Sequence, residues 1–149
     1  MAKIRLTKEF GFETAHALWK YDGLCKNIHG HSYKLFVTVI GTPRADDYHP
    51  KNGMVMDFGD LKRIVKEEIV DPMDHSVVFY DRAPVAQLLL VPQMFDRHHF
   101  LPYQPTCENM LVDFAERIVR RLPDEIQLHS LRLHETENSF AEWFAQDNL

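Results

Sequence analysis

Alternation of apolar and polar residues near the start of the chain predicts a β-strand that ends at a histidine. The apolar residues Ile4, Leu6, Phe10 and Phe12 share one parity, and His16 has the same parity. Successive side chains of a strand point to opposite faces, so His16 is expected at the end of the buried face. A second strand is predicted over residues 33–40, which are rich in β-branched and aromatic side chains, and it should pair with the first as a hairpin.

Two amphipathic helices follow, each bounded by residues that favour helix ends. The first should begin after Asp57, a credible N-cap, and Pro72 is expected to end it. The second should open at Pro105 and Thr106, and Pro123 closes it. Each helix carries one apolar stripe and should therefore pack one face against a core.

Alternation returns in the last part of the chain, where Glu135 shares the parity of two leucines on a predicted strand. Another strand is predicted over 140–144, and a short one at 54–56. This order predicts an α+β fold, a four-stranded antiparallel sheet with two helices packed on one face. The uncovered face and the free sheet edges predict a homo-oligomer.

The connection between residues 84 and 105 has no clear periodicity. Connections of about twenty residues in compact domains are usually functional or mobile. We therefore hypothesise that this connection forms a lid or an oligomer contact. Its neighbouring histidines, His98 and His99, are expected in a polar loop, since adjacent strand residues face opposite ways.

Composition narrows the classes of protein to consider. The 149 residues, 45% of them hydrophobic, predict a single domain over 1–149. A net charge of −5 lacks the basic footprint of nucleic-acid binding. Without a membrane-length apolar run or a signal-peptide pattern, we expect no membrane partner and a cytoplasmic location. The two cysteines show no disulfide pattern, so Cys25 is expected to be free for chemistry and Cys107 to be a buried filler.

Three histidines near the predicted hairpin indicate a metal site. His29 and His31 project to one face because they are two residues apart, and Gly30 between them crowds neither ring. His16 can supply a third ligand at matching parity. Three imidazoles leave a tetrahedral position open, as in catalytic Zn2+ sites, although copper, nickel and iron also accept imidazole. The alternative is a polar turn beside a hydrogen-bonded edge histidine.

Four further side chains could take part in chemistry at such a site. The Cys25 thiol, with its pKa lowered by a nearby cation, could act as a base, or it could be a fourth metal ligand. Asp74 and His75 could form a proton relay or be a solvated pair. Glu135 on a buried face needs a partner, either an internal Arg or Lys side chain or the amidine-like edge of a heterocyclic ligand. Glu108 suits the first turn of a helix.

Six short motifs in order resemble those of the family of 6-pyruvoyl-tetrahydropterin and 6-carboxytetrahydropterin synthases, over nearly the whole chain. They are residues 12–16 (FETAH), 25–31 (CKNIHGH), 56–62 (MDFGDLK), 73–75 (MDH), 105–109 (PTCEN) and 134–136 (HET). The three residues between Cys25 and His29 resemble the bacterial carboxy-forming branch of queuosine biosynthesis, whereas the animal pyruvoyl-forming members tend to have five. The stretch from 77 to 104 looks longer than in compact bacterial members.

The resemblance implies a tunnel fold that oligomerises into a barrel, as trimers and hexamers with active sites between subunits. It implies zinc on the three histidines and 7,8-dihydroneopterin triphosphate as the substrate. Cys25 would be the catalytic base, Asp74 and His75 the relay, and Glu135 the pterin anchor. The motif at 105–109 would place Thr106 and Glu108 at the substrate.

Three other functions stay open at this point. A pyruvoyl-forming or otherwise side-chain-cleaving pterin synthase would share the metal and the anchor. A non-catalytic zinc or pterin-binding module would use Cys25 as a ligand. A zinc hydrolase would use metal-bound water and would not need Cys25.

Overall fold

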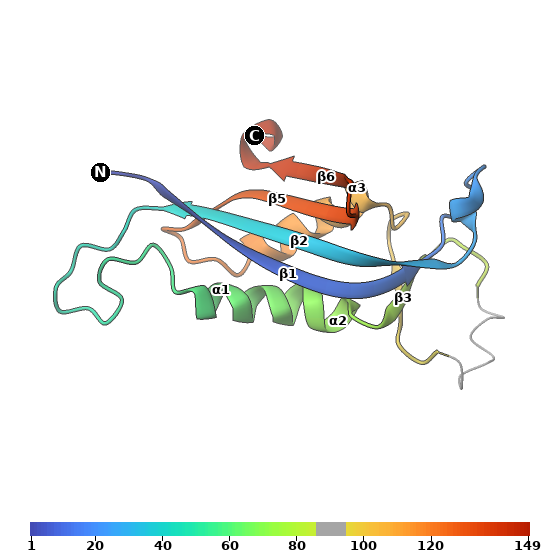
Figure 1. The fold of residues 1–149 in the computed structure, drawn as a ribbon, viewed down its shortest axis with the longest axis horizontal. Helices are drawn as coiled ribbons and strands as arrows, with labels where there is room; N and C mark the ends of the chain where they lie inside the picture. The colour runs from blue at the N-terminus through green and yellow to red at the C-terminus, as the bar shows by residue number, and fades with distance from the viewer. Residues whose placement is uncertain (86–94) are drawn as a thin grey trace.

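The two longest strands form a hairpin that runs along the molecule (Figure 1). In the computed structural model, which describes residues 1–85 and 95–149, β1 (Ile4–His16) pairs with β2 (His29–Gly41) in antiparallel register. His16 lies directly opposite His29 at one end of this ladder. The predicted hairpin is confirmed, and the second strand begins early enough to include the histidine pair.

Four shorter strands complete a mixed sheet. In the described ranges the strand order is β4-β3-β1-β2-β5-β6. On one side of the hairpin, β3 (Ser76–Tyr80) runs parallel to β1, and β4 (His98–Leu101) runs parallel to β3. On the other side, β5 (Gln127–Thr136) and β6 (Ser139–Phe144) continue the antiparallel pattern.

The predicted four-stranded antiparallel sheet is therefore wrong, because the described residues form six strands with two parallel pairings. In β3, the first four positions are buried, so this strand lacks the alternation that reveals a half-exposed strand. β4 is only four residues long, and it holds His98 and His99 in a strand and not in the expected loop. The hypothesis of a lid or oligomer contact concerns a connection whose residues 86–94 lie outside the described part of the chain.

The short strand expected at 54–56 is also wrong. Val55 and Met56 are bends, and residues 54–56 form no strand pairing with any described residue. The Arg44 amide donates to the Met54 carbonyl at 2.9 Å, and the Gly53 amide donates to the Arg44 carbonyl at 2.8 Å. These bonds close a compact loop in place of a strand.

The first predicted helix is a continuous helical run built of α1 (Phe58–Val65), η2 (Lys66–Val70) and α2 (Asp71–Met73). Asp57 caps it by accepting a hydrogen bond from the Gly59 amide at 2.7 Å, so the predicted N-cap is confirmed.

This run passes through Pro72 and ends one residue later than predicted. A proline cannot donate to the carbonyl four residues before it, which is that of Glu68. Here the Arg117 guanidinium donates to the Glu68 carbonyl at 3.0 Å, and a π turn precedes the proline. A bond from another helix thus satisfies the carbonyl that the proline leaves free.

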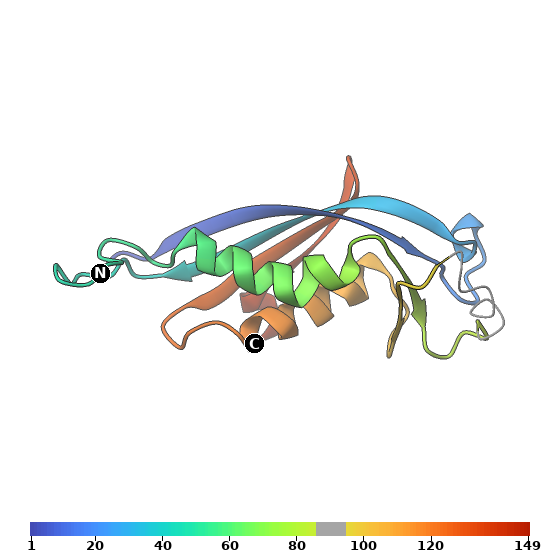
Figure 2. The same ribbon diagram turned by 90° about the horizontal axis from the view of Figure 1, so that it is seen from below.

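The second predicted helix is α3 (Cys107–Val119), and Thr106 caps it by accepting from the Asn109 amide at 3.2 Å. Both long helices cover the concave side of the curved sheet, as predicted (Figure 2). The core between the two layers includes fully buried Leu35, Leu133, Leu61 and Phe114. Burying a side chain of this size stabilises the fold by roughly 1.5–3 kcal/mol.

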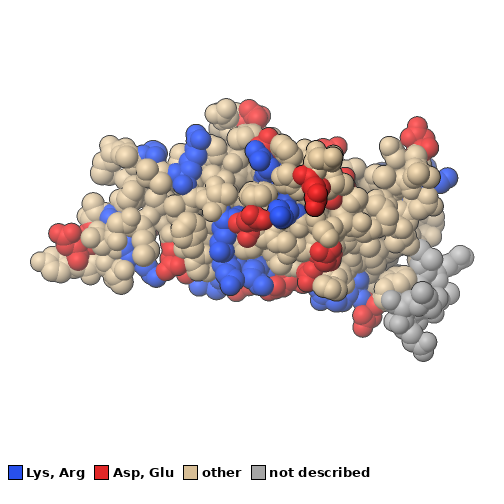
Figure 3. All heavy atoms as spheres, viewed as in Figure 1, with Lys and Arg blue, Asp and Glu red and all other residues tan. Residues whose placement is uncertain are grey.

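Two short 3₁₀ helices, η1 (Leu24–Lys26) and η4 (Ala145–Asn148), complete the described elements. Basic and acidic side chains intermingle on the face drawn in Figure 3. Among the helices of the described ranges, none combines the length and the apolarity that a bilayer span needs.

Candidate metal centre and its surroundings

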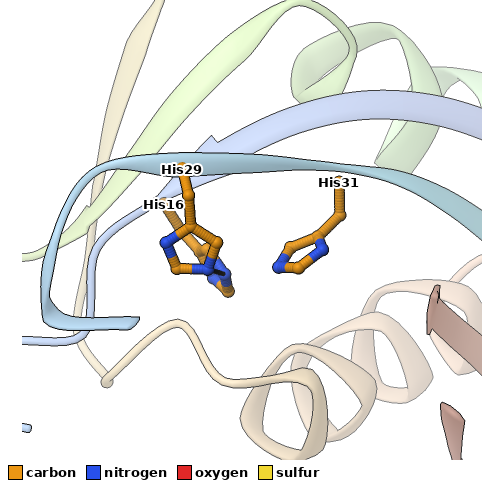
Figure 4. A group of neighbouring side chains, drawn as sticks. All are labelled: His16, His29 and His31. Carbon is orange, nitrogen blue, oxygen red and sulfur yellow. Dashed lines mark hydrogen bonds between the residues drawn. The ribbon is translucent and has the colours of Figure 1, made fainter. Parts of the chain in front are cut away.

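The three predicted metal-ligand histidines come together at one end of the sheet. His16 ends β1, His29 begins β2 opposite it, and His31 follows on the same face of β2. Their rings point toward one another (Figure 4), and one ligand nitrogen from each lies within 4.8 Å of the other two. The alternation of the two strands is what aims all three side chains to the helix side.

Backbone carbonyls decide which ring nitrogens are available. The Nδ1 atom of His16 donates to the Pro105 carbonyl and that of His29 to the Asn27 carbonyl, each at 2.7 Å. In a neutral imidazole the other nitrogen, Nε2, then carries only a lone pair. The two Nε2 atoms face each other at 3.1 Å, where two lone pairs repel unless a proton or a cation lies between them.

Burial argues against the proton. His16 is 1% exposed, and desolvation lowers its pKa to about 4. Desolvation also lowers the pKa of His31, whose Nε2 atom is buried without a hydrogen-bond partner among the described residues. Three imidazoles whose ligand nitrogens converge in this way fit a divalent cation such as Zn2+.

Glu135 reaches the same cluster from β5. The pairing of β5 with β6 shifts register between His134 and Thr136, so Glu135 lies at a bulge, where side chains are commonly re-aimed. Its Oε1 atom lies 3.5 Å from Nε2 of His31 and 3.6 Å from Nε2 of His16. The residue faces the buried side, as its parity predicted.

The negative charge of Glu135 also affects the pKa of two buried neighbours. Burial, and then this carboxylate, raise the pKa of the Tyr33 hydroxyl. The same two causes raise the pKa of the Cys107 thiol to about 12. Cys107 is 7% exposed and donates to the Leu133 carbonyl, which confirms the expected filler role.

Cys25 lies in η1, within the loop that joins the two histidine-bearing strands. Its thiol is free and exposed. The loop is held at this residue because the Leu18 amide donates to the Cys25 carbonyl at 3.0 Å. The thiol is therefore accessible from solvent.

The loop that enters α3 passes beside the histidines (Figure 4), because its Pro105 carbonyl accepts from His16. Thr106 and Glu108 follow at the start of α3, with the Thr106 side chain committed to its cap and Glu108 exposed. Gln104 ties this loop to Trp19 by two hydrogen bonds, of 3.0 and 2.8 Å. Sequence reasoning missed Gln104 and the two carbonyl acceptors, which have no signature in a single sequence.

Asp74 and His75 form the predicted pair, on the turn between α2 and β3. His75 Nδ1 donates to Asp74 Oδ2 at 2.9 Å, and Asp74 Oδ1 accepts from the Glu13 amide at 2.8 Å. His75 is 76% exposed and lines a hollow of about 390 Å³ together with Glu13, Ser32 and His31. Glu13 and Ser32 have the parity opposite to that of His16 and His31, so their side chains point to the other face of the sheet. The relay thus opens on the other face of the sheet.

Comparison with known proteins identifies relatives along nearly the whole chain. Residues 5–146 match the model of the 6-pyruvoyl tetrahydropterin synthase family. The chain is 40% identical over 146 residues to a 6-carboxy-5,6,7,8-tetrahydropterin synthase of Haemophilus influenzae, covering 93% of this chain and 97% of that one. It is 29% identical over 147 residues to the Homo sapiens 6-pyruvoyl tetrahydrobiopterin synthase, covering 91% and 87%.

Solved structures share the fold. The 6-pyruvoyl tetrahydropterin synthase of Caenorhabditis elegans superposes with a TM-score of 0.68 at 20% identity over 97% of both chains. An uncharacterized protein of Wolinella succinogenes gives a TM-score of 0.78 at 19% identity, over 97% of this chain and 99% of that one. The match along nearly the whole chain places it in one family: the chain belongs to the 6-pyruvoyl tetrahydropterin synthase family.

Proposed function

We propose that this chain is a zinc-dependent lyase of queuosine (7-deazaguanine) biosynthesis. It would convert 7,8-dihydroneopterin triphosphate and one water into 6-carboxy-5,6,7,8-tetrahydropterin, acetaldehyde and triphosphate. The observation that carries the proposal is the cluster of three converging imidazoles beside a buried-face carboxylate, in a chain 40% identical to a 6-carboxy-5,6,7,8-tetrahydropterin synthase.

His16, His29 and His31 would hold the metal through nitrogen atoms that converge at one end of the sheet. Three imidazole ligands suit zinc and leave one position open for substrate. When bound there, zinc supplies Lewis-acid stabilisation of negative charge on the oxygens of the substrate side chain. The Pro105 and Asn27 carbonyls keep two of the rings in the tautomer and orientation that ligation needs.

Cys25 would be the base that removes a carbon-bound proton from the substrate side chain. Its thiol is exposed in the loop between the ligand-bearing strands. A divalent cation nearby favours the thiolate form, which is the form that accepts a proton. The electron pair left on carbon would be delocalised toward the oxygens of the side chain.

Glu135 would anchor the pterin ring. The edge of a pterin presents a ring N–H and an amino group side by side, and a carboxylate can accept both hydrogen bonds. Glu135 is half-buried, with its carboxylate beside the histidines, so an anchored ring would present its side chain to the metal and to the thiol. Thr106 and Glu108 would line the same end of α3.

Asp74 and His75 would serve the site of a neighbouring copy. In one chain this pair opens on the face of the sheet opposite to the histidine cluster. In a symmetric trimer or hexamer, a second copy would bring its own His75 to the histidine cluster of the first. The imidazole, held by the carboxylate, would then pass protons to and from the substrate.

Mass spectrometry of the pterin formed by the zinc-loaded protein tests this function. Incubation with 7,8-dihydroneopterin triphosphate should yield 6-carboxy-5,6,7,8-tetrahydropterin together with acetaldehyde, assayed in parallel. A pyruvoyl product would instead assign the chain to the pyruvoyl-forming branch. Unchanged substrate would contradict the lyase proposal and favour a binding module.

A further inference from the structure

Arg97, directly before β4, binds the turn that carries the Asp74–His75 pair. Arg97 Nη2 donates to the carbonyl of Asp71 at 2.6 Å, to that of Pro72 at 3.3 Å and to that of Asp74 at 2.8 Å. Its Nε atom donates to the Asp74 carbonyl as well, at 3.2 Å. One guanidinium thus links three carbonyls at the end of the helical run.

The position suits an arginine for two physical reasons. The last carbonyls of a helix lack intrahelical partners, and a cation there meets the negative end of the helix dipole. A guanidinium also offers several N–H donors in a fixed plane, which a lysine does not.

The backbone of the same segment is fixed to β3, because the Val77 amide donates to the Arg97 carbonyl at 3.1 Å. His99 adds a further bond to the turn, from its Nε2 to the Pro72 carbonyl at 2.6 Å. The arginine is therefore tied in place by its own backbone and by its neighbour on β4.

The turn needs this support because His75 has an unfavourable backbone conformation. Its φ of +57° lies in the left-handed region, which residues with a Cβ rarely adopt and which persists where the surroundings enforce it. On one side the Glu13 carbonyl accepts from the His75 amide at 2.6 Å. On the other side Arg97 holds the carbonyl of the preceding residue, Asp74.

We infer that Arg97 is a positioning residue for the Asp74–His75 pair, holding the turn in the conformation from which His75 acts. The inference rests on the proposed function for its catalytic consequence, but its structural content stands on the bonds around the turn. Arg97 touches no substrate in this account and acts only through His75.

Replacement of the guanidinium tests the inference by kinetics. Arg97→Met keeps the side-chain stem and removes every donor, and it should lower kcat by about tenfold to a hundredfold, the usual cost of a misplaced catalytic group. KM should stay within about twofold, because the pterin anchor is untouched. Arg97→Lys keeps the positive charge but lacks the planar set of N–H donors, so its kcat should fall between that of Arg97→Met and that of the wild type.

A double-mutant cycle separates positioning from general destabilisation. In a His75→Ala background, Arg97→Met should cost little further activity, since the group it positions is gone. Arg44→Met is the matched control, because Arg44 is exposed and paired with Glu125 at 3.7 Å. It belongs to the loop that joins β2 to α1, and Figure 1 shows this loop at the end of the molecule opposite to β3, so loss of the Arg44 guanidinium should leave kcat unchanged. Wild-type kcat in Arg97→Met, or a loss that adds in full to that of His75→Ala, would overturn the inference.

Amide hydrogen exchange gives a reading that needs no turnover. The His75 amide should exchange about tenfold faster or more in Arg97→Met and at the wild-type rate in Arg44→Met, while the Leu35 amide in the central sheet stays unchanged in both. Equal exchange of the His75 amide in Arg97→Met and wild type would overturn the positioning role. An inactive wild type would contradict the proposed function alone, and exchange would then decide the role of Arg97.

Discussion

At His16 and His29 a backbone carbonyl fixes the tautomer, and this is what turns a group of rings into a candidate metal site. The three residues themselves could be predicted, because strand alternation aims side chains two apart to one face. The carbonyls of Pro105 and Asn27 could not. Pro105 is 89 residues from His16, and only the packed path of the chain brings them together.

Loss of one imidazole should abolish tight metal binding. His31→Ala removes one of three ligands, so the zinc affinity should fall by about a hundredfold or more, beyond the usual cost of changes around the ligands. Competition with a chromogenic chelator measures it, and His134→Ala is the matched control, since that ring packs against Phe36 and Phe140. Equal zinc affinity of His31→Ala and wild type would remove the metal site from this account.

Replacement of Cys25 distinguishes a catalytic base from a metal ligand. If the thiol acts as a base, Cys25→Ala should lower turnover by about 10²–10⁴-fold while the zinc content stays at the wild-type level. Parallel turnover and metal analysis of the same preparation check this. Loss of zinc would make the thiol a ligand, and full turnover with zinc bound would remove its catalytic role.

At the scale of elements, predictions from sequence were correct where alternation or helical periodicity was complete. The hairpin, the two capped helices and the two last strands were predicted for that reason. β3 and β4 were missed because the first is buried at nearly every position and the second is very short. The end of the first helix was misplaced by one residue, because Arg117, from another helix, supplies a bond that local sequence does not show.

The turn after that helix should make stability depend on pH. The Glu13 amide, and to a lesser degree His75 and Arg97, hold the pKa of Asp74 below its ordinary value. A carboxyl group whose pKa is lower in the folded state stabilises the fold above its unfolded pKa of about 3.9, and this contribution is lost as the pH falls through the folded pKa.

Urea unfolding of wild type and Asp74→Asn from pH 7 to pH 3 measures that contribution. The wild type should be the more stable protein at neutral pH, and the difference should shrink as the pH falls below about 4. A difference that is independent of pH over this range would mean that the Asp74 charge does not stabilise the turn.

At the scale of the whole molecule, one chain presents its candidate groups on two faces of a curved sheet. The histidine cluster and Glu135 face the helices, whereas His75 lines a hollow on the opposite face. Sequence alone could place each residue on a strand or a turn. It could not show that the two groups are separated within one chain, because β3 joins the sheet beside β1 through a parallel pairing that was not predicted. Assembly of the site from two copies stays a prediction.

Complementation between two impaired variants tests this account most directly. Cys25→Ala and His75→Ala should each convert 7,8-dihydroneopterin triphosphate about 10²–10⁴-fold more slowly than the wild type, and mixing them under conditions of subunit exchange should restore activity. Random mixing in a symmetric ring pairs an intact Cys25 with an intact neighbouring His75 in about a quarter of the sites, so about a quarter of the wild-type rate is expected. No recovery, although native mass spectrometry shows mixed oligomers, would contradict a site shared between copies.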